Sequence, residues 1–380
     1  PVMEGETLVA LTRDEAAITL EPAGQLELSG APMKTAHETC RELFGHINEL
    51  RRISDPWDVG WLTLGRNPIT ATDDLPWMPK ERYAIMRSYL PRRGSMALDM
   101  MLGTGTVQTN IDYADERDMA AKMRLASAVA PILTALYANS PFAGGQPTGF
   151  LSTRSHVWQN TDPDRCGIPP AVFHGDFGYG DYIDFALDVP MFFIQREGRY
   201  LDYAGKSFRA FLSDGLDGHR ATQADWVLHL STLFPEARLK NVIELRMVDV
   251  GPLPMICSLP ALTRGLFYDE GALAEATGLV GALEPNSYPE LQRDAARLAL
   301  AAQAGGKPLR EWARELLHIA AAGLGRLNAV DGKGENEVKY LDPLFRIVET
   351  GKTNADLLLE HWRGDWKGSV EPLFNEEMML

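Results

Sequence analysis

The sequence has little cysteine and a deficit of positive charge, and each shortage narrows what the protein can be. Only three cysteines, Cys40, Cys166 and Cys257, occur among its 380 residues. They are too few and too scattered for a disulfide framework or a zinc site, so we expect a reducing compartment. The formal net charge is -15, which disfavours a nucleic-acid backbone or an anionic membrane as a partner.

Long apolar runs and several common motifs are also missing. No stretch of about 18 apolar residues occurs, as a membrane-spanning helix requires, and the first residues, "PVMEGETLVALT", lack the layout of a signal peptide. These features predict a cytoplasmic protein. "LGTGT" has no third glycine opening a helix, so it is no dinucleotide or phosphate-loop fingerprint. Without a Gly-Xaa-Ser-Xaa-Gly elbow, nucleophilic serine chemistry has no support.

The elements present predict an α+β protein. Short alternating runs in "LVALT", "ITLE", "GQLELSG" and "VGWLTLG" predict antiparallel strands. Helical spacing follows in "KTAHETCRELFGHINELRRI" and "KERYAIMRSYL", and a helix is expected from Glu116 to Asn139, divided at Pro131. A chain of this length forms one large enzyme domain or two intimately packed halves.

The rest of the chain is predicted to contain long loops, a few strands and then mostly helices. Residues 141–182 are rich in Gly, Pro and Asp and are predicted to form long loops, the usual carriers of functional side chains. Strands are expected in "MFFIQ" and "VIELRMVD". From about residue 258 the pattern is nearly all helical. We therefore expect mixed strands and helices over 1–257 and a mostly helical part over 258–380.

Three of the expected strands have one continuous polar face. In a strand, alternate side chains share a face. The residues that share such a face are Thr104, Thr106, Gln108, Asn110 and Asp112 in "TGTVQTNID", Gln25, Glu27 and Ser29 in "GQLELSG", and Glu244 and Arg246 in "VIELRMVD".

Two explanations fit these polar faces. Water covering one side of an antiparallel sheet is the commoner explanation for any single strand. If the faces converge, however, two carboxylates, two amides and a guanidinium line one interior. Carboxylate and amide oxygens suit magnesium, and Arg246 would then meet a phosphate that the metal also contacts.

Longer stretches of the sequence resemble a known family. "TVQTNIDYADERDMAAKMRLA", "ALYANSPFAGGQPTGFLSTRSHVWQNTDPDRCG", "FALDVPMFF", "FPEARLK" and "LEPAGQLELSGAP" are similar to the plant and proteobacterial type of glutamate–cysteine ligase. The similarity continues through "YLDPLFRIVETGKTNADLLLEHWRGDW", so it covers essentially the whole chain.

The resemblance implies ATP-dependent amide formation in a single ligase domain. The γ-carboxylate of glutamate takes the γ-phosphate of ATP, and the amine of cysteine then displaces phosphate from the γ-glutamyl phosphate. The product, γ-glutamylcysteine, starts glutathione-type thiol synthesis. Magnesium, or manganese in its place, offsets the crowded negative charge. The implied fold is an antiparallel sheet curled into a funnel with helices outside, related to glutamine synthetase, in a monomer or homodimer.

The resemblance also implies roles for individual residues. The implied metal ligands are Glu27, Gln108 and Glu244; the implied catalytic residues are Glu244 and Arg246; the implied ATP contacts are Arg246 and Lys240; and the implied substrate contacts are Arg82, Arg154, Asn110 and Ser152. The arginines suit carboxylate binding because guanidinium is a planar two-pronged donor. Each could instead form a surface ion pair.

The first departure from the family lies at the N-terminus. Relatives carry an earlier strand with a "GTEHE"-like pair of metal-binding acids, and this chain begins beyond it. Glu4 and Glu6 in "VMEGETL" imitate that pair, but their distance to the next strand leads us to interpret the imitation as chance. Either the segment is missing from this sequence or the homologue does without it, and without it metal binding should be crippled.

The second departure is a loss of arginines. Where relatives read roughly "EMRGADGGPWRR", this chain has "ELRMVDVGPLPM", with Pro254 and Met255 near the lost pair, and "LRTCT" becomes "LGTGT" at Gly103. These losses put cysteine as the acceptor in doubt. A γ-glutamyl ligase for another amine and a non-catalytic, metabolite-binding homologue therefore stay open.

Overall fold

The computed structural model describes residues 1–4 and 6–374 and shows a mixed α+β protein. Helix α1 (Ala36–Ser54) illustrates how the sequence sets an element. The Thr35 hydroxyl accepts a hydrogen bond from the Glu38 amide, and the Glu38 carboxylate accepts one from the Thr35 amide. This reciprocal cap satisfies amides that the first helical turn leaves unpaired.

The other helices confirm most of the helical prediction. Pro131 lies at the start of α5, and the chain bends by 47° between α4 and α5. The remaining α-helices are α2 (Glu81–Tyr89), α3 (Ala97–Gly103), α4 (Glu116–Ala128), α5 (Ala130–Leu136), α6 (Thr153–Gln159), α7 (Tyr179–Asp188), α8 (Phe208–Asp214), α9 (Gln223–Leu230), α10 (Leu253–Phe267), α11 (Glu270–Val280), α12 (Tyr288–Leu298), α13 (Leu309–Leu327), α14 (Asp342–Thr350) and α15 (Asn354–Arg363).

The strands form several small sheets. A four-stranded antiparallel sheet has the order β1 (Val2–Glu4), β2 (Thr7–Arg13), β3 (Ala16–Leu20) and β4 (Leu26–Ser29). A three-stranded antiparallel sheet has the order β12 (Ala237–Leu239), β13 (Ile243–Leu245) and β5 (Thr109–Ile111). The two-stranded pairs are β6 (Phe142–Ala143) with β7 (Gln146–Pro147), β8 (Cys166–Gly167) with β11 (Phe234–Pro235), β9 (Phe193–Arg196) with β10 (Arg199–Asp202), and β14 (Gln303–Ala304) with β15 (Lys307–Pro308).

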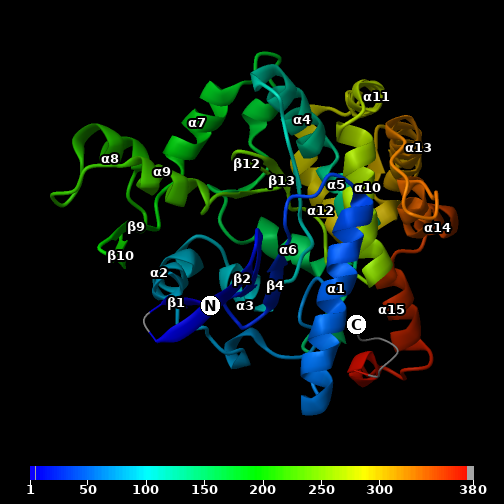
Figure 1. The fold of residues 1–380 in the computed structure, drawn as a ribbon, viewed down its shortest axis with the longest axis horizontal. Helices are drawn as coiled ribbons and strands as arrows, with labels where there is room; N and C mark the ends of the chain where they lie inside the picture. The colour runs from blue at the N-terminus through cyan, green and yellow to red at the C-terminus, as the bar shows by residue number, and fades with distance from the viewer. Residues whose placement is uncertain (5, 375–380) are drawn as a thin grey trace.

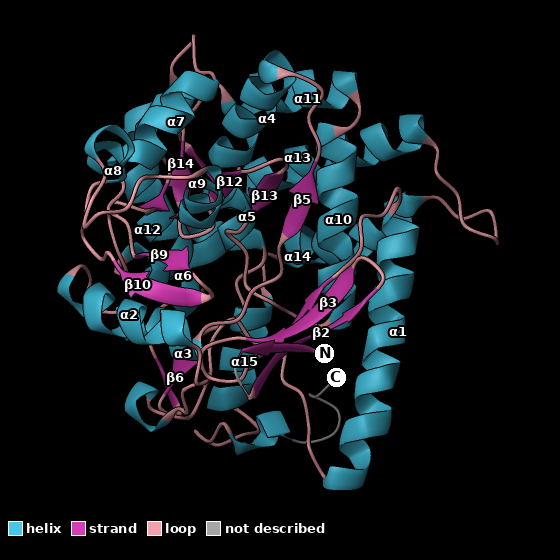
Figure 2. Cartoon of the chain, turned by 60° about the vertical axis from the view of Figure 1, so that its left-hand side comes forward, coloured by secondary structure: helices cyan, strands magenta, loops and turns pink. Residues whose placement is uncertain are grey.

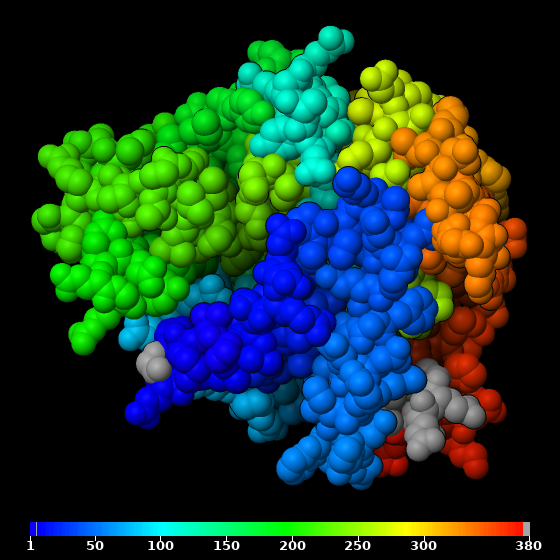
Figure 3. All heavy atoms as spheres, in the orientation of Figure 1, coloured from blue at the N-terminus to red at the C-terminus, as the bar shows by residue number. Residues whose placement is uncertain are grey.

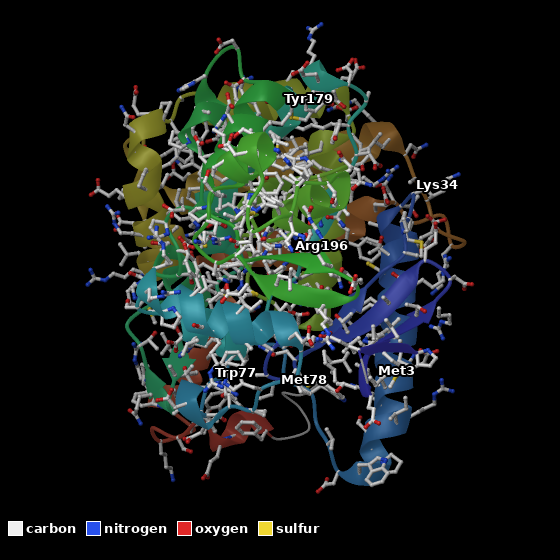
Figure 4. The ribbon with its side chains drawn as sticks, turned by 90° about the vertical axis from the view of Figure 1, so that its left-hand side faces the viewer. Met3, Lys34, Trp77, Met78, Tyr179 and Arg196 are labelled. Atoms are coloured by element: carbon white, nitrogen blue, oxygen red, sulfur yellow. The ribbon has the colours of Figure 1, made fainter. Side chains whose placement is uncertain are left out.

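The expected single curled sheet is therefore divided in two. Figures 1 and 2 both place the four-stranded sheet below the three-stranded one. Among the strands described, β4 pairs only with β3 and β5 pairs only with β13. The outer edge strand, β1, carries Met3, which is exposed and lies on the outside of the molecule in Figure 4. The polar strands of the prediction thus come from two sheets.

Two local predictions were wrong. "VGWLTLG" forms no regular strand; it ends in an isolated bridge between Arg66 and Thr104. A Cβ on Gly65 would lie 2.5 Å from the side chain of Asp249, so glycine there allows a close approach to a buried carboxylate. The segment 141–182 is not all loop, because α6 and the start of α7 fall within it.

The core joins both halves of the chain. The largest buried cluster includes residues of α4, α5, α10 and α13, and α10 itself spans the boundary expected at residue 257. Cys40 and Cys257 are both buried, and Cys40 Sγ lies 3.9 Å from the Cys257 carbonyl oxygen. Within the described ranges no single helix is long and apolar enough to cross a membrane; α4 and α5 together would be, by length and composition only.

Candidate active site

The polar face of the three-stranded sheet brings together residues far apart in sequence. Glu244 on β13 lies opposite Asn110 on β5 and opposite Arg238 on β12. Directly opposed residues of an antiparallel pair point to the same face. The polar side of "TGTVQTNID" therefore faces the same space as Glu244.

A second polar row lies two residues further along the strands. The Arg246 amide donates to the Glu236 carbonyl oxygen at 2.9 Å, which continues the ladder between the strands. The Arg246 Nη1 donates to Gln108 Oε1 at 3.3 Å. Glu236, Arg246 and Gln108 thus form a row beside the row of Arg238, Glu244 and Asn110, and charges of opposite sign alternate across β12 and β13.

Glu244 lies at the centre of the positive charge. Arg238 Nε donates to its Oε2 at 2.6 Å, Arg246 Nη1 lies 3.2 Å from the same oxygen, and Lys240 Nζ lies 3.9 Å from Oε1. Burial raises the pKa of Glu244, but these three cations outweigh burial and lower the pKa overall. Burial is also the main cause that lowers the pKa of Arg238 to about 10 and the pKa of Lys240.

The four-stranded sheet contributes a pair of carboxylates. Glu27 on β4 lies opposite Thr19 on β3, and Glu21 is two residues beyond Thr19, so all three share a face. Burial, followed by the charge of Glu21, raises the pKa of Glu27 to about 7, and the charges of Arg246 and Glu244 also reach it. The polar faces of the two sheets therefore converge, although β4 and β13 belong to different sheets.

Strand β4, which carries Glu27, belongs to a sheet that borders a hollow (Figure 3). Its side chain is open to water, as the alternation in β4 predicts, yet surrounding protein atoms desolvate it enough to raise its pKa. Figure 3 shows a hollow between the dark blue N-terminal strands and the green segment above them. Water reaches such a carboxylate from one side, while protein atoms on its other sides remove part of its hydration.

Arg154, on α6, lies next to Arg246 of the three-stranded sheet. It is 3% exposed, and its Nη2 donates to the Arg246 carbonyl oxygen at 2.7 Å. Its Nε has no hydrogen-bond partner among the described residues. Arg154 and Arg246 each lie 5.7 Å from the ring centre of Trp158, and burial lowers the pKa of Arg154 to about 10.

Ser152 corrects one predicted substrate contact. Its side chain is completely buried, its hydroxyl donates to Asp249 Oδ1 at 2.8 Å, and it accepts from the Ser155 amide at 3.1 Å. The hydroxyl is occupied in starting α6 and anchoring it to Asp249. Ser152 therefore positions Arg154, and its buried hydroxyl is not free to contact a substrate.

Arg82 approaches the carboxylate pair from α2. Its guanidinium lies 5.1 Å from the ring centre of Tyr83. Burial lowers the pKa of Arg82, but Tyr83 and the charge of Glu21 outweigh it and raise the pKa overall. Glu4 has a different task, because its Oε1 accepts a hydrogen bond from the Glu81 amide at the start of α2.

Arg66 lies beside Gly103, where the resemblance implied the loss of an arginine. A Cβ added to Gly103 would lie 3.7 Å from Arg66 Nη1. Arg66 is buried and forms an ion pair with Asp99, whose Oδ1 also accepts a hydrogen bond from Thr72 at 2.6 Å. Arg66 therefore places one guanidinium beside Gly103.

Three charged residues of the site were missed from the sequence: Glu21, Glu236 and Arg238. The alternation in "PEARLK" places Glu236, Arg238 and Lys240 on one face, and the same rule that found Glu244 would have found them. Glu21 precedes a turn, which hid its shared face with Glu27. The sequence of one strand does not indicate which residues of another strand will lie opposite it.

The acidic pair fits a divalent cation better than Glu244 does. No group of three or more His, Cys, Asp or Glu side chains suited to a metal occurs in residues 1–4 and 6–374. Glu244 is already neutralised by arginines, and Gln108 Oε1 accepts from Arg246. Glu21 and Glu27 instead repel each other when both are ionised, and a divalent cation with oxygen ligands would remove that repulsion.

Comparison with known proteins places the chain in a family. Residues 2–376 match the description "Glutamate-cysteine ligase family 2(GCS2)". The glutamate–cysteine ligase of Brassica juncea is 44% identical over 99% of this chain and 72% of its own length, and that of Arabidopsis thaliana is 42% identical over 99% and 71%. That of Medicago truncatula is 42% identical over 99% and 73%; all three are named chloroplastic. The chain therefore belongs to glutamate–cysteine ligase family 2.

Proposed function

We propose that this protein joins the γ-carboxylate of glutamate to the amine of cysteine at the expense of ATP, forming γ-glutamylcysteine through a γ-glutamyl phosphate. Relatives that are named for this reaction match almost the whole chain. The observation that carries the proposal is the convergence of two sheet faces, which brings Glu27 within electrostatic reach of Glu244 and Arg246.

The acidic residues of the site would bind the metal, and the cationic residues would bind phosphate. Glu21 and Glu27 would hold a magnesium ion, whereas Gln108, the third ligand expected from the sequence, accepts a hydrogen bond from Arg246 instead. When bound, magnesium supplies positive charge that offsets the triphosphate and the acyl phosphate. Arg246 and Lys240 offer donors to phosphate oxygens, and Glu244 holds Arg246 in place through its ion pair.

The two remaining arginines hold glutamate. Arg82 lies on the side of the carboxylate pair, and Arg154 lies beneath Arg246 with an unpartnered Nε. Asn110, exposed opposite Glu244, offers an amide to the same substrate. Holding both reactants in one orientation removes part of the entropic barrier to their reaction.

The funnel is part of the same proposal. β4 and β5 each have one unpaired edge among the described strands, so one further extended segment could join the two sheets into a single curved one. The monomeric or homodimeric state, the use of manganese and the cytoplasmic location stay predictions.

A different acceptor amine is the second candidate. Pro254 and Met255 occupy the start of α10, near where relatives carry paired arginines, and neither can bind an anion. An acceptor without the carboxylate of cysteine would suit this change. A binding protein without activity is the third candidate, and the family residues Glu27, Glu244 and Arg246, which the resemblance implies are kept, argue against it.

One assay separates the three. Purified protein receives ATP, magnesium and glutamate, with and without cysteine and then a panel of amines, and ADP release is followed. Release stimulated by cysteine, with γ-glutamylcysteine identified by mass, supports the proposal. Stimulation by another amine alone supports the second candidate, and no release under any condition contradicts both enzyme functions.

A further inference from the structure

Two buried arginines bind the turn that leads from α9 into the strands of the site. The turn comprises Ser231, Thr232 and Leu233, and we call it the 231–233 turn. Arg238 Nη1 donates hydrogen bonds to the carbonyl oxygens of Ser231 and Leu233 at 2.9 and 3.0 Å. Arg165 Nη1 donates to the carbonyl oxygen between them, that of Thr232, at 3.1 Å. Two guanidinium groups therefore hold three successive carbonyl groups.

Arg165 is completely buried, and each nitrogen of its guanidinium group is bonded within the protein. Besides the turn, it binds Asp162 Oδ2 through Nε at 2.7 Å and the Pro190 carbonyl oxygen through Nη2 at 2.9 Å. The guanidinium also lies 3.7 Å from the ring centre of Phe192, which adds a cation–π contact. Because all three nitrogens are engaged in the folded chain, we assign Arg165 no direct contact with a substrate.

The remaining nitrogens of Arg238 reach the candidate active site. Its Nε donates to Glu244 Oε2 at 2.6 Å, and its Nη2 lies 2.5 Å from the same oxygen. Glu244 also forms an ion pair with Arg246, which in the proposed function meets phosphate. A guanidinium group is planar and rigid, so a shift of the carbonyl groups at Arg238 Nη1 would also shift the nitrogens at Glu244. The turn is therefore connected to the site through one side chain.

We propose that Arg165 is a positioning residue for the ligase reaction, and that it acts through Arg238. Arg165 fixes the 231–233 turn, and the turn fixes one side of the Arg238 guanidinium. The other side then holds Glu244, and through it Arg246, in the orientation that phosphate binding requires. The assignment rests on the proposed function, because that function gives Arg246 a phosphate to meet.

Lysine in place of either arginine would break this connection without removing a charge. An ammonium group is a compact point charge, whereas a guanidinium group spreads its donors over a plane. In Arg165→Lys the ammonium still compensates Asp162, so no buried charge is left alone, but it cannot also hold the turn. In Arg238→Lys the ammonium still pairs with Glu244 and likewise loses the turn. We therefore expect both variants to fold, with lower melting temperatures than the wild type.

The test measures kcat and KM for ADP release by the full chain with ATP, magnesium, glutamate and cysteine. A misplacement of about 1 Å can cost about 100-fold in rate. We therefore expect Arg165→Lys and Arg238→Lys each to lower kcat about tenfold or more and to change the KM for glutamate little. The double variant should have the kcat of Arg238→Lys to within about twofold, because the connection is already broken there.

Two further variants complete the test. Arg93 is the other cation beside Asp162, with its Nε 3.6 Å from Oδ1, so Arg93→Lys controls for disturbance of that carboxylate and should keep the wild-type kcat. The Thr232 hydroxyl donates to the His229 carbonyl oxygen at 2.7 Å, so Thr232→Val loosens the 231–233 turn with no change of charge. It should lower kcat in the wild type but not in Arg238→Lys, and it decides the question if Arg165→Lys does not fold.

The outcomes separate this assignment from the proposed function. A folded Arg165→Lys with the wild-type kcat would overturn the assignment, whatever its melting temperature. A double variant whose loss of kcat is the product of the two single losses would overturn it as well, because independent positions behave in that way. Both outcomes leave the proposed function standing. No ADP release by the wild type with any amine would overturn the proposed function, and the assignment with it.

Discussion

Glu244 and Asn110 lie directly opposite each other on β13 and β5, although they are 134 positions apart in the chain. On its other side Glu244 faces Arg238, and Arg246 lies 3.2 Å from its Oε2. The carboxylate therefore has two tasks: it belongs to the site, and it neutralises two buried guanidinium groups.

Glu244→Gln should abolish ADP release and also destabilise the protein. Removing one partner of a buried ion pair leaves the other charge uncompensated and costs about 3–5 kcal/mol of unfolding free energy. Urea unfolding and ADP release measure the two effects. The loss of stability follows from the contacts of Glu244 with Arg238 and Arg246, which the substitution leaves without a carboxylate.

A second substitution separates the two tasks of Glu244. The double variant Glu244→Gln, Arg238→Gln also removes the Arg238 charge that the single substitution leaves uncompensated. Most of the lost stability should therefore return, while ADP release stays absent. Wild-type turnover in either variant would remove Glu244 from the site. Equal instability of the single and double variants would contradict the charge argument.

Magnesium dependence tests the acidic pair. Glu21→Gln and Glu27→Gln each remove one of two oxygen ligands, so the magnesium concentration for half-maximal ADP release should rise about tenfold or more. The exposed Glu284→Gln serves as the control. If both site variants keep the wild-type magnesium requirement, the cation is held elsewhere.

The sequence predicted the strands of the site but not their assembly. Alternation placed Glu27 and Glu244 on polar faces, and the register of β13 with β5 confirmed that Asn110 shares the face of Glu244. Alternation does not say which strands pair, so the division into two sheets could not be foreseen. Nor could it show that Ser152 is buried, because helix α6 is seven residues long and lies amid loop-forming residues.

Arg82 and Arg87 on α2 offer a matched pair for the glutamate site. Arg82 is near Glu21, whereas Arg87 is exposed and its guanidinium lies 4.6 Å from the ring centre of Trp77. Figure 4 shows Trp77 on the lower side of the molecule. Arg82→Ala should raise the KM for glutamate about tenfold or more and the KM for ATP much less. Arg87→Ala should change neither, and equal effects of the two substitutions would contradict the assignment.

An arginine at position 103 should partly replace the one at position 66. Gly103→Arg alone adds a second guanidinium beside Arg66 Nη1, and Arg66→Gln alone leaves Asp99 without its ion-pair partner, so each should lower the melting temperature and ADP release. The double variant restores one guanidinium to the same place and should recover part of both losses. Melting curves and ADP release of the three variants measure the coupling, and simply additive losses would show that the two positions are independent.

His229 gives the protein a predictable sensitivity to acid. Burial, followed by the charge of Arg165, lowers the pKa of His229 to about 4, and its Nε2 lies 2.8 Å from the Ala186 carbonyl oxygen. The folded-state pKa is below the unfolded value of 6.5, so this stability is present above pH 6.5 and is lost as the pH falls towards 4. The shift corresponds to about 3 kcal/mol. His229→Gln stays neutral at every pH and can still donate a hydrogen bond to the Ala186 carbonyl oxygen. The free energy of urea unfolding of this variant should therefore depend less on pH between pH 4 and 7 than that of the wild type or of the exposed control His361→Gln. The same pH dependence in all three proteins would contradict the prediction.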